Sequence, residues 1–446
     1  MVKIFGTDGI RGKANVFPIT SEVAMKFGMA AGHFFKKDEY RHRVVIAKDT
    51  RISGYMLEPA LTSGFISVGM DVILVGPMPT PAVPMLIKSL RADLGVMISA
   101  SHNPYQDNGL KLFNSEGYKL TDDLEQKIQE MMFGADLQSF LVSPEDLGRA
   151  KRLDDAPGRY VEHVKRSFPK GMTLKDLRIV IDCANGAGYH LAPNILWELG
   201  AEVIKIGCEP DGFNINHGCG STSVDALAKK VVETRADIGI ALDGDADRVV
   251  ICDEKGKVVA GDHVIGAIAQ SMKEQSTLSG NSVVVTQMSN GALDKFLSGL
   301  GLKTHRALIG DRYVSEKMRE HNCNLGGEQS GHIIFGDYST TGDGIVCALQ
   351  LLAFMVKKQK PISELVHLFD LNPQITRNIK FNTFNPLEDK KINTKLHAIQ
   401  DGLKDLRILV RKSGTEKLIR VMVEGENMLQ INTAADEIEQ LLVSNL

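Results

Sequence analysis

Short apolar runs alternate with longer amphipathic stretches through most of the chain. Runs rich in β-branched residues predict buried strands at residues 43–47, 72–75, 94–99, 178–182, 237–242 and 282–286. Before the first of these, Val23, Phe27, Ala31 and Phe34 recur at helical spacing, with Ser21 as the expected N-cap. A longer apolar helix is predicted at residues 344–357. Strands that alternate with helices in this way are typical of α/β units with largely parallel sheets.

The pattern changes from Asn372 onward. Strand-like segments are predicted at residues 375–381, 407–411 and 418–423, and helices at 389–403 and 427–446. This order indicates a small α+β domain. Polar segments with Pro or Gly then predict four domains, at residues 1–155, 156–256, 257–371 and 372–446. The expected fold class is three similar α/β domains with mixed, largely parallel sheets, followed by a smaller α+β domain.

The composition narrows the class of protein. A chain of 446 residues with 43% hydrophobic and 24% charged residues is typical of a globular protein with several domains. Its 52 Lys and Arg against 55 Asp and Glu give a net charge of -3, which provides no long-range field for nucleic acid. We find no apolar leader near the start and no run of 18 apolar residues. We therefore expect a cytoplasmic protein, not bound to membranes or nucleic acid, whose six scattered cysteines are reduced.

Three carboxylates, Asp243, Asp245 and Asp247, follow the predicted strand at 237–242 with small residues between them. This concentration of negative charge is costly without a cation, and oxygen ligands favour Mg²⁺, Mn²⁺ or Ca²⁺ over zinc. A calcium EF-hand is one alternative, because Glu254 stands at the twelfth position, but its loop needs Gly at the sixth, where Arg248 stands. A solvated acidic turn is the other. We predict a metal site at the end of this strand.

A serine follows another predicted strand, at residues 94–99. The strand leads into Ala100, Ser101, His102, Asn103 and Pro104, so a hydroxyl is presented on a loop that proline stiffens. Ser101 is a candidate nucleophile, and a plain turn-capping serine is the alternative. The G-x-S-x-G pattern of serine hydrolases is missing around it, which disfavours acyl transfer.

Two further loops combine polar side chains with glycine. Residues 326–332 place Glu328, Ser330 and His332 among glycines, which suits a polyol ligand, although a flexible Gly-rich turn has the same composition. Residues 411–415 join a guanidinium, two hydroxyls and a glycine, the parts of a phosphate-binding loop that is not a P-loop. A basic hairpin loop is the alternative there.

Taken together, these motifs resemble those of the α-D-phosphohexomutase superfamily along essentially the whole chain. They occur in the family's order: residues 5–12 (FGTDGIRG), 49–54 (DTRISG), 99–104 (SASHNP), 108–111 (NGLK), 243–248, 326–332 and 411–415. The resemblance implies three similar α/β domains and a smaller fourth domain around one cleft, each contributing one loop. Lys417 departs from the pattern, since the family commonly has proline there.

The resemblance also implies a role for each loop. Ser101 would carry a phosphoryl group, and one Mg²⁺ per subunit would bind Asp243, Asp245, Asp247 and the Ser101 phosphate. Lys111 and His332 would transfer protons, and a cationic cleft would lower the pKa of the lysine. Arg11 and Arg248 would stabilise charge on the phosphoryl group. Sugar binding is implied for Glu328 and Ser330, and phosphate binding for Arg411, Ser413, Gly414 and Thr415.

Residues 5–12 and Gln329 are most similar to those of superfamily members that act on glucosamine phosphates. The implied reaction interconverts glucosamine 6-phosphate and glucosamine 1-phosphate, on the route to UDP-N-acetylglucosamine and the cell wall. It would pass through a bound 1,6-bisphosphate, with glucosamine 1,6-bisphosphate or glucose 1,6-bisphosphate as activator. A glucose or mannose phosphomutase, a phosphosugar-binding regulator without catalysis, and a net phosphatase are the alternatives. A homodimer is compatible with the resemblance.

Overall fold

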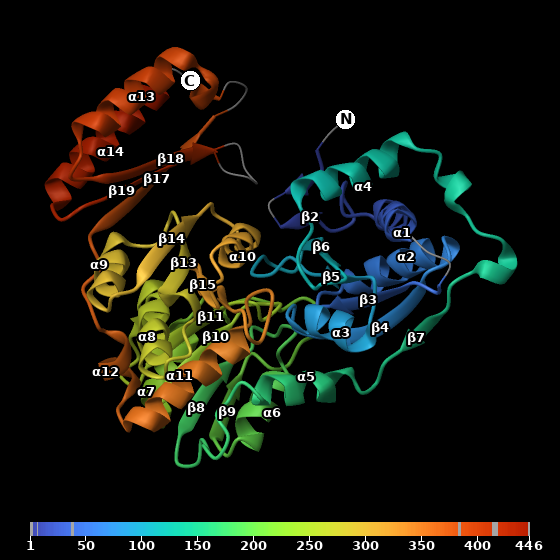
Figure 1. Ribbon diagram of the computed structural model, residues 1–446, viewed down its shortest axis with the longest axis horizontal. Helices are drawn as coiled ribbons and strands as arrows, with labels where there is room; N and C mark the ends of the chain where they lie inside the picture. The colour runs from blue at the N-terminus through green and yellow to red at the C-terminus, as the bar shows by residue number, and fades with distance from the viewer. Residues whose placement is uncertain (1–2, 7, 37–39, 382–384, 413–417, 445–446) are drawn as a thin grey trace. The chain divides into compact units, whose positions relative to one another are not determined.

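The fold is taken from a computed structural model that describes residues 3–6, 8–36, 40–381, 385–412 and 418–444. The chain forms two compact units. The first comprises Met1–Thr286 and Gly301–Leu368, and the second comprises Gln287–Leu300 and Phe369–Leu446 (Figure 1). Each unit is described by itself below. No helix among the described residues has the length and apolar character needed to cross a membrane.

The first sheet of the first unit has seven strands in the order β1-β2-β6-β5-β3-β4-β7. Its strands β5, β3, β4 and β7 are parallel, while β1, β2 and β6 pair antiparallel at one edge. The strand bounds, in sheet order, are Phe5–Gly6, Gly9–Lys13, Asp107–Asn114, Leu94–Ile98, Arg43–Lys48, Asp71–Pro77 and Ala150–Arg152.

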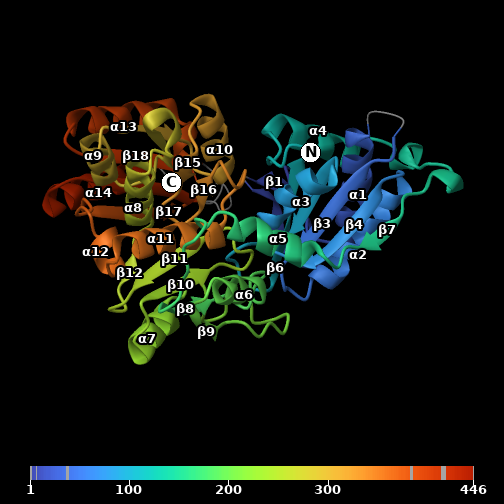
Figure 2. The ribbon, with the colours of Figure 1, turned by 60° about the horizontal axis from the view of Figure 1, so that its bottom comes forward.

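Helices cover both faces of this sheet. Helices α1 (Ser21–Phe35), α2 (Gly54–Ser67) and α4 (Asp122–Gly134) share a core with alternate residues of β3 and β5. Helix α3 (Ala82–Leu90) lies on the other face, where a Cβ at Gly95 would meet Val83 and Ile87 (Figure 2). The expected N-cap Ser21 was wrong. Thr20 is the cap, because its hydroxyl accepts the Val23 N–H at 3.3 Å.

Two smaller sheets complete the first unit. One has the order β12-β11-β10-β8-β9, with bounds Val258–Val259, Val249–Asp253, Ile238–Leu242, Arg178–Asp182 and Glu202–Ile206. The other has the order β14-β13-β15-β16, with bounds Lys303–Ala307, Ser282–Thr286, Leu325–Gly327 and Ile333–Phe335. The helices of this part are α5 (Ala156–Lys165), α6 (Leu191–Glu198), α7 (Asp225–Thr234), α8 (Gly261–Glu274), α10 (Asp311–Glu320), α11 (Gly344–Lys358) and α12 (Ile362–Val366).

The second unit is built on a three-stranded antiparallel sheet. Its order is β17-β19-β18, with bounds Gln374–Lys380, Leu418–Glu424 and Arg407–Lys412. Helices α13 (Lys390–Gly402) and α14 (Met428–Val443) share its core, and the unit also contains α9 (Gly291–Gly299). The three α/β sheets and this α+β unit confirm the predicted fold class. The predicted strands are present with ends that agree or differ by a few residues. The strands that were not predicted are β1, β2, β6, β7, β9, β11, β12, β14, β15 and β16.

Candidate active site

Ser101 is held in one conformation by its backbone. It follows β5 with a φ of 52°, in the left-handed region that non-glycine residues seldom adopt. The Ser99 hydroxyl accepts the Ser101 N–H at 2.9 Å. The Ser101 carbonyl accepts from the Arg51 guanidinium at 2.8 Å and from the Asn216 amide at 2.9 Å. Because its N–H and carbonyl are both held, the backbone from which the Ser101 hydroxyl projects is fixed.

That hydroxyl points at the aspartate cluster. Ser101 Oγ donates to Asp243 Oδ2 at 2.5 Å, and both side chains are fully buried. His102 Nδ1 lies 3.3 Å from the same Oγ and 3.2 Å from a guanidinium nitrogen of Arg248. Burial, together with the charges of Arg248 and Arg11, lowers the pKa of His102 to about 4. The serine is therefore next to a neutral imidazole and an acidic cluster.

The three aspartates follow β10 and turn toward one another. One ligand oxygen from each of Asp243, Asp245 and Asp247 lies within 4.8 Å of the others, and all three residues are buried. Asp245 Oδ1 and Asp247 Oδ1 are buried and accept no hydrogen bond from the described residues. Burial raises the pKa of Asp243 well above its usual range, and the charges of Asp247 and Asp245 add to the effect. Orphaned oxygens and crowded carboxylates fit a hard divalent cation.

Lys111 reaches this cluster from β6. Its Nζ lies 2.7 Å from Asp245 Oδ2, 3.2 Å from Asp247 Oδ2 and 3.3 Å from Asp8 Oδ2. Burial alone would lower the pKa of Lys111, but the three carboxylates outweigh it and raise the pKa well above the usual value. The expectation that a cationic cleft lowers this pKa was wrong, because the nearest groups to the ammonium are acidic.

His332 lies between two carboxylates. Its Nδ1 is 3.5 Å from Asp247 Oδ1 and its Nε2 is 3.3 Å from Asp311 Oδ2. Burial lowers the pKa of His332, but Asp247 and Asp311 more than offset it, so the net shift is upward. The Gly342 N–H donates to Nε2 at 2.9 Å, so Nε2 is the hydrogen-bond acceptor of the neutral ring. A second proton would have to displace that backbone hydrogen bond.

Four residues that the sequence analysis did not single out complete the cluster. Thr80 donates its hydroxyl to Asp245 Oδ2 at 2.6 Å. Lys119 bridges Asp8 and Asp311, with its Nζ 2.6 Å from Asp311 Oδ2. Asp8 lies within the FGTDGIRG motif, which is the one signal that could have indicated it. Thr80, Lys119 and Asp311 lie outside the motifs that the sequence analysis singled out, so no local pattern indicated them.

The remaining predicted residues fall into three groups. Arg11 pairs with Asp8, and the Arg248 N–H donates to Asp243 Oδ1 at 3.2 Å. Glu328 is buried after β15 and accepts the Gly310 N–H at 3.1 Å, while Ser330 is exposed in the same loop. Arg411 is in β18 of the second unit. Ser413, Gly414, Thr415 and Lys417 lie outside the described residues.

The chain matches the four domains of one family. The matches are to phosphoglucomutase/phosphomannomutase alpha/beta/alpha domain I at residues 2–139, domain II at 158–256, domain III at 260–371 and the C-terminal domain at 382–441. A buried serine and three aspartates that follow strands, with a lysine of β6 beside them, agree with this match. The chain belongs to the phosphoglucomutase/phosphomannomutase family, and it is a phosphomutase enzyme.

The chain is also similar to individual proteins of known name or structure. A phosphoglucosamine mutase from Parvibaculum lavamentivorans is 56% identical over 447 residues, which cover 99% of this chain and 99% of that protein. The fold is shared with a solved phosphoglucomutase/phosphomannomutase family protein from Burkholderia thailandensis (TM-score 0.84, 24% identity, covering 100% of this chain and 98% of that one). It is also shared with Aspergillus fumigatus N-acetylphosphoglucosamine mutase, solved with GlcNAc-6P and magnesium (TM-score 0.65, 18% identity, covering 99% and 95%).

Proposed function

We propose that this enzyme interconverts glucosamine 6-phosphate and glucosamine 1-phosphate through a phosphoserine at Ser101 and a bound 1,6-bisphosphate. The observation that carries the proposal is the Ser101 hydroxyl, buried and directed at Asp243 at 2.5 Å beside two further aspartates. The substrate is inferred from relatives such as the P. lavamentivorans phosphoglucosamine mutase. A glucosamine or glucose 1,6-bisphosphate would prime Ser101.

The aspartates would hold one Mg²⁺, with an oxygen of the Ser101 phosphate as a further ligand. When bound, the ion would neutralise charge on the transferring phosphoryl group. Lys111 adds a fixed positive charge, since its ammonium stays protonated among Asp8, Asp245 and Asp247. We assign Arg11 and Arg248 to the same task. These cations stabilise the negative charge of the phosphoryl group while it passes between Ser101 Oγ and a sugar oxygen. The net charge of the site stays the same during the transfer.

In the first half-reaction, the bond from phosphorus to Ser101 Oγ breaks and a bond to the free sugar hydroxyl forms. The sugar hydroxyl loses its proton to a protein group, and the departing Ser101 oxygen takes up a proton, so no net proton is gained or lost. The Ser101 hydroxyl is then left to accept the other phosphoryl group in the second half-reaction. We assign proton transfer to His332, because Lys111, the other candidate, stays protonated among its three carboxylates and serves as the fixed charge described above. His332 is supported by its place between Asp247 and Asp311, which favours a positive charge on the ring.

The other predicted residues act in binding. Glu328 and Ser330 would contact the sugar hydroxyls in either orientation, and Arg411, Ser413, Gly414 and Thr415 would bind the phosphate that does not react. This assignment uses one loop from each of the domains proposed at residues 1–155, 156–256, 257–371 and 372–446. A cytoplasmic homodimer is part of the proposal.

The substrate is tested by parallel assays. The purified enzyme with Mg²⁺ and a bisphosphate activator is assayed on glucosamine, glucose and mannose 6-phosphates. We expect the highest kcat/KM with glucosamine 6-phosphate. A higher value for either neutral sugar would assign the enzyme to that sugar, and release of inorganic phosphate faster than isomerisation would indicate a phosphatase.

The carrier is tested with Ser101→Ala. We expect a loss of isomerisation of roughly 10³-fold or more, because the two phosphoryl transfers have no other acceptor. Ser139→Ala, at an exposed position of a short 3-10 helix, is the matched control and should leave the rate unchanged. Mass spectrometry of bisphosphate-treated wild type should find one phosphate on the Ser101 peptide. A peptide that stays unmodified, in a protein that binds phosphosugars, would instead indicate a non-catalytic regulator.

A further inference from the structure

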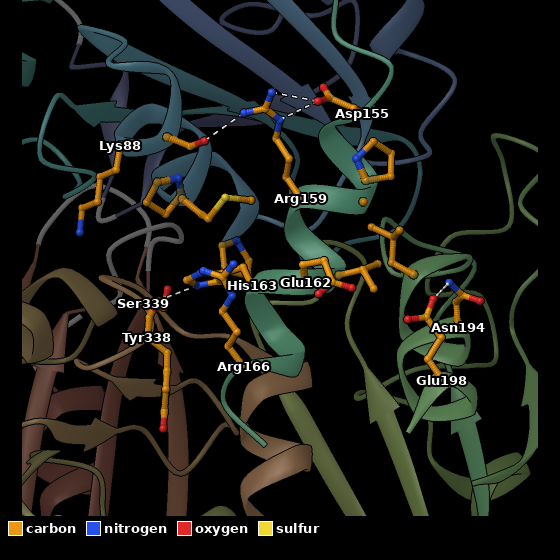
Figure 3. A pocket seen from close by; sticks show the side chains of 18 of the residues that line it. Lys88, Asp155, Arg159, Glu162, His163, Arg166, Asn194, Glu198, Tyr338 and Ser339 are labelled. Atoms are coloured by element: carbon orange, nitrogen blue, oxygen red, sulfur yellow. Dashed lines mark hydrogen bonds and ion pairs between the residues drawn. The ribbon is translucent and has the colours of Figure 1, made fainter. Parts of the chain in front are cut away.

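A large cavity lies in the first unit, away from the aspartate cluster. It has a volume of about 820 Å³ and is bounded by α3, α5, α6 and the loop at residues 338–340 (Figure 3). Neither Ser101 nor any of the three aspartates lines it. Its volume is in the range of sites for small organic ligands. The apolar wall comes from two elements, with Pro84 and Met85 on α3 and Pro157 on α5 among its residues.

Two exposed cations in the wall of this cavity form no ion pair within the part of the chain that the structure describes, although the charge of Arg166, after that of Lys165, helps to lower the pKa of Glu162. Lys88 on α3 and Arg166 at the end of α5 form no ion pair and no side-chain hydrogen bond with the described residues. In Figure 3 both side chains lie in the half of the view that contains Ser339. They are therefore available to an anionic ligand.

Each carboxylate of the wall already has a cationic partner, and one lysine serves two of them. Asp155 pairs with Arg159 at 2.9 Å, and Lys165 binds Glu162 at 2.6 Å and Glu198 at 2.5 Å. These ion pairs therefore reduce the repulsion between the three carboxylates and an anionic ligand in the cavity. An anion that enters the cavity would meet two unpaired positive groups and no unpaired carboxylate from the described wall residues.

Two walls of the cavity continue directly into the active site. Pro81 follows Thr80, whose hydroxyl binds Asp245. Thr340 precedes Thr341 and Gly342, and the Gly342 N–H donates to His332 Nε2. The same loop is tied to α5, because the His163 Nε2 lies 2.9 Å from the Tyr338 carbonyl. A ligand that moves this loop would disturb a contact of His332.

We propose that this cavity binds a nucleoside diphosphate, which lowers the rate of the enzyme. Lys88 and Arg166 bind the phosphates, and the apolar wall contacts the base. A diphosphate matches two cations supplied by separate elements, and the base accounts for the apolar wall, which a sugar phosphate would leave uncovered. The effect on rate rests on the proposed function, whereas the binding does not.

Binding is measured by calorimetry with UDP, ADP, uridine and pyrophosphate on the full-length protein. We expect UDP or ADP to bind, and the double variant Lys88→Ala/Arg166→Ala to raise the Kd at least tenfold. Lys127→Ala/Arg149→Ala is the matched control, because both side chains are exposed and outside the cavity, and its Kd should equal that of wild type. Uridine should bind far more weakly than UDP.

Three outcomes would overturn the proposal. The first is failure of both nucleotides to bind at millimolar concentration. The second is an unchanged Kd in the double variant, which would place binding in the active site. The third is equal affinity for pyrophosphate, which would remove the role of the base. In the isomerase assay, the nucleotide that binds should inhibit wild type and not the double variant, whose basal rate is unchanged. Nucleotide binding by a protein without isomerase activity would refute the proposed function alone.

Discussion

Side chains that do no chemistry themselves hold the reacting groups in place. Arg51 is almost fully buried, and its guanidinium donates to the carbonyls of Ser101 and Asn103 at 2.8 Å and to that of Asp107 at 3.0 Å. Its charge is balanced by Asp49 at 2.8 Å. A buried cation needs such partners, since an unpaired one would carry the full cost of desolvation. The serine loop is therefore kept rigid by one residue far from it in the sequence.

Thr80 does the same for the metal site. Replacing it by Val removes the hydroxyl that binds Asp245 at 2.6 Å and keeps the side chain's shape. We expect a loss of Mg²⁺ affinity or activity of about 10- to 100-fold, which is typical when a partner of a metal ligand is removed. Titration of activity with Mg²⁺ measures it. Thr173→Val, which removes a hydroxyl that binds the Leu199 carbonyl, is the control. Equal Mg²⁺ dependence in both variants would contradict the assignment.

Helices from distant parts of the chain are joined by one buried arginine. Arg312, near the start of α10, donates to the Leu120 carbonyl at 2.8 Å and lies 2.7 Å from Asp122 and 3.2 Å from Glu125 at the start of α4. Burial raises the pKa of Glu125 to about 7, and Arg312 offsets only part of that shift. The contact between α10 and α4 is therefore sensitive to pH near neutrality.

The sign of this pH dependence follows from the raised pKa. Below about pH 4.5 Glu125 is protonated in both the folded and the unfolded protein, and as pH rises through about 7 the folded state must accept a buried charge. Stability is therefore lost as pH rises across that window, by up to about 3 kcal/mol. In Glu125→Gln this loss is absent, so the Tm of wild type should fall relative to the variant between pH 5 and pH 8. A constant difference in Tm would contradict the prediction.

On the scale of the whole molecule, the compact units do not follow the order of the sequence. Residues 287–300 group with the C-terminal strands and not with the flanking sheet. Glu424, buried at the end of β19, accepts the Gly291 N–H at 2.7 Å and the Asn372 amide at 3.0 Å, and it pairs with Arg407. Arg407 also donates to the carbonyl of Gln287 at 2.7 Å. Helix α9 is thus tied to a sheet that follows it by more than 70 residues.

Glu424→Ala should destabilise the second unit. It leaves the Gly291 N–H and the Arg407 guanidinium without their acceptor, which costs roughly 2–4 kcal/mol for a buried charged partner. Calorimetry should show a lower unfolding temperature for one transition, and hydrogen exchange should be faster in α9. Glu426→Ala, an exposed neighbour that pairs with Lys295 at 2.9 Å, is the control and should leave both measurements unchanged. Unchanged exchange in α9 for Glu424→Ala would refute this role.

The sequence by itself determined the features that depend on short stretches of chain. The strands at 178–182 and 282–286 have the predicted ends, because β-branched runs and their polar borders are local. The motifs around Ser101 and the three aspartates likewise indicated phosphosugar chemistry. Tertiary structure decided the rest. Lys111 stays charged because Asp8 and Asp245, far apart in sequence, meet at its ammonium, and α9 joins the second unit through Glu424. Such contacts depend on which strand ends and helices the topology brings together, and no local pattern records that.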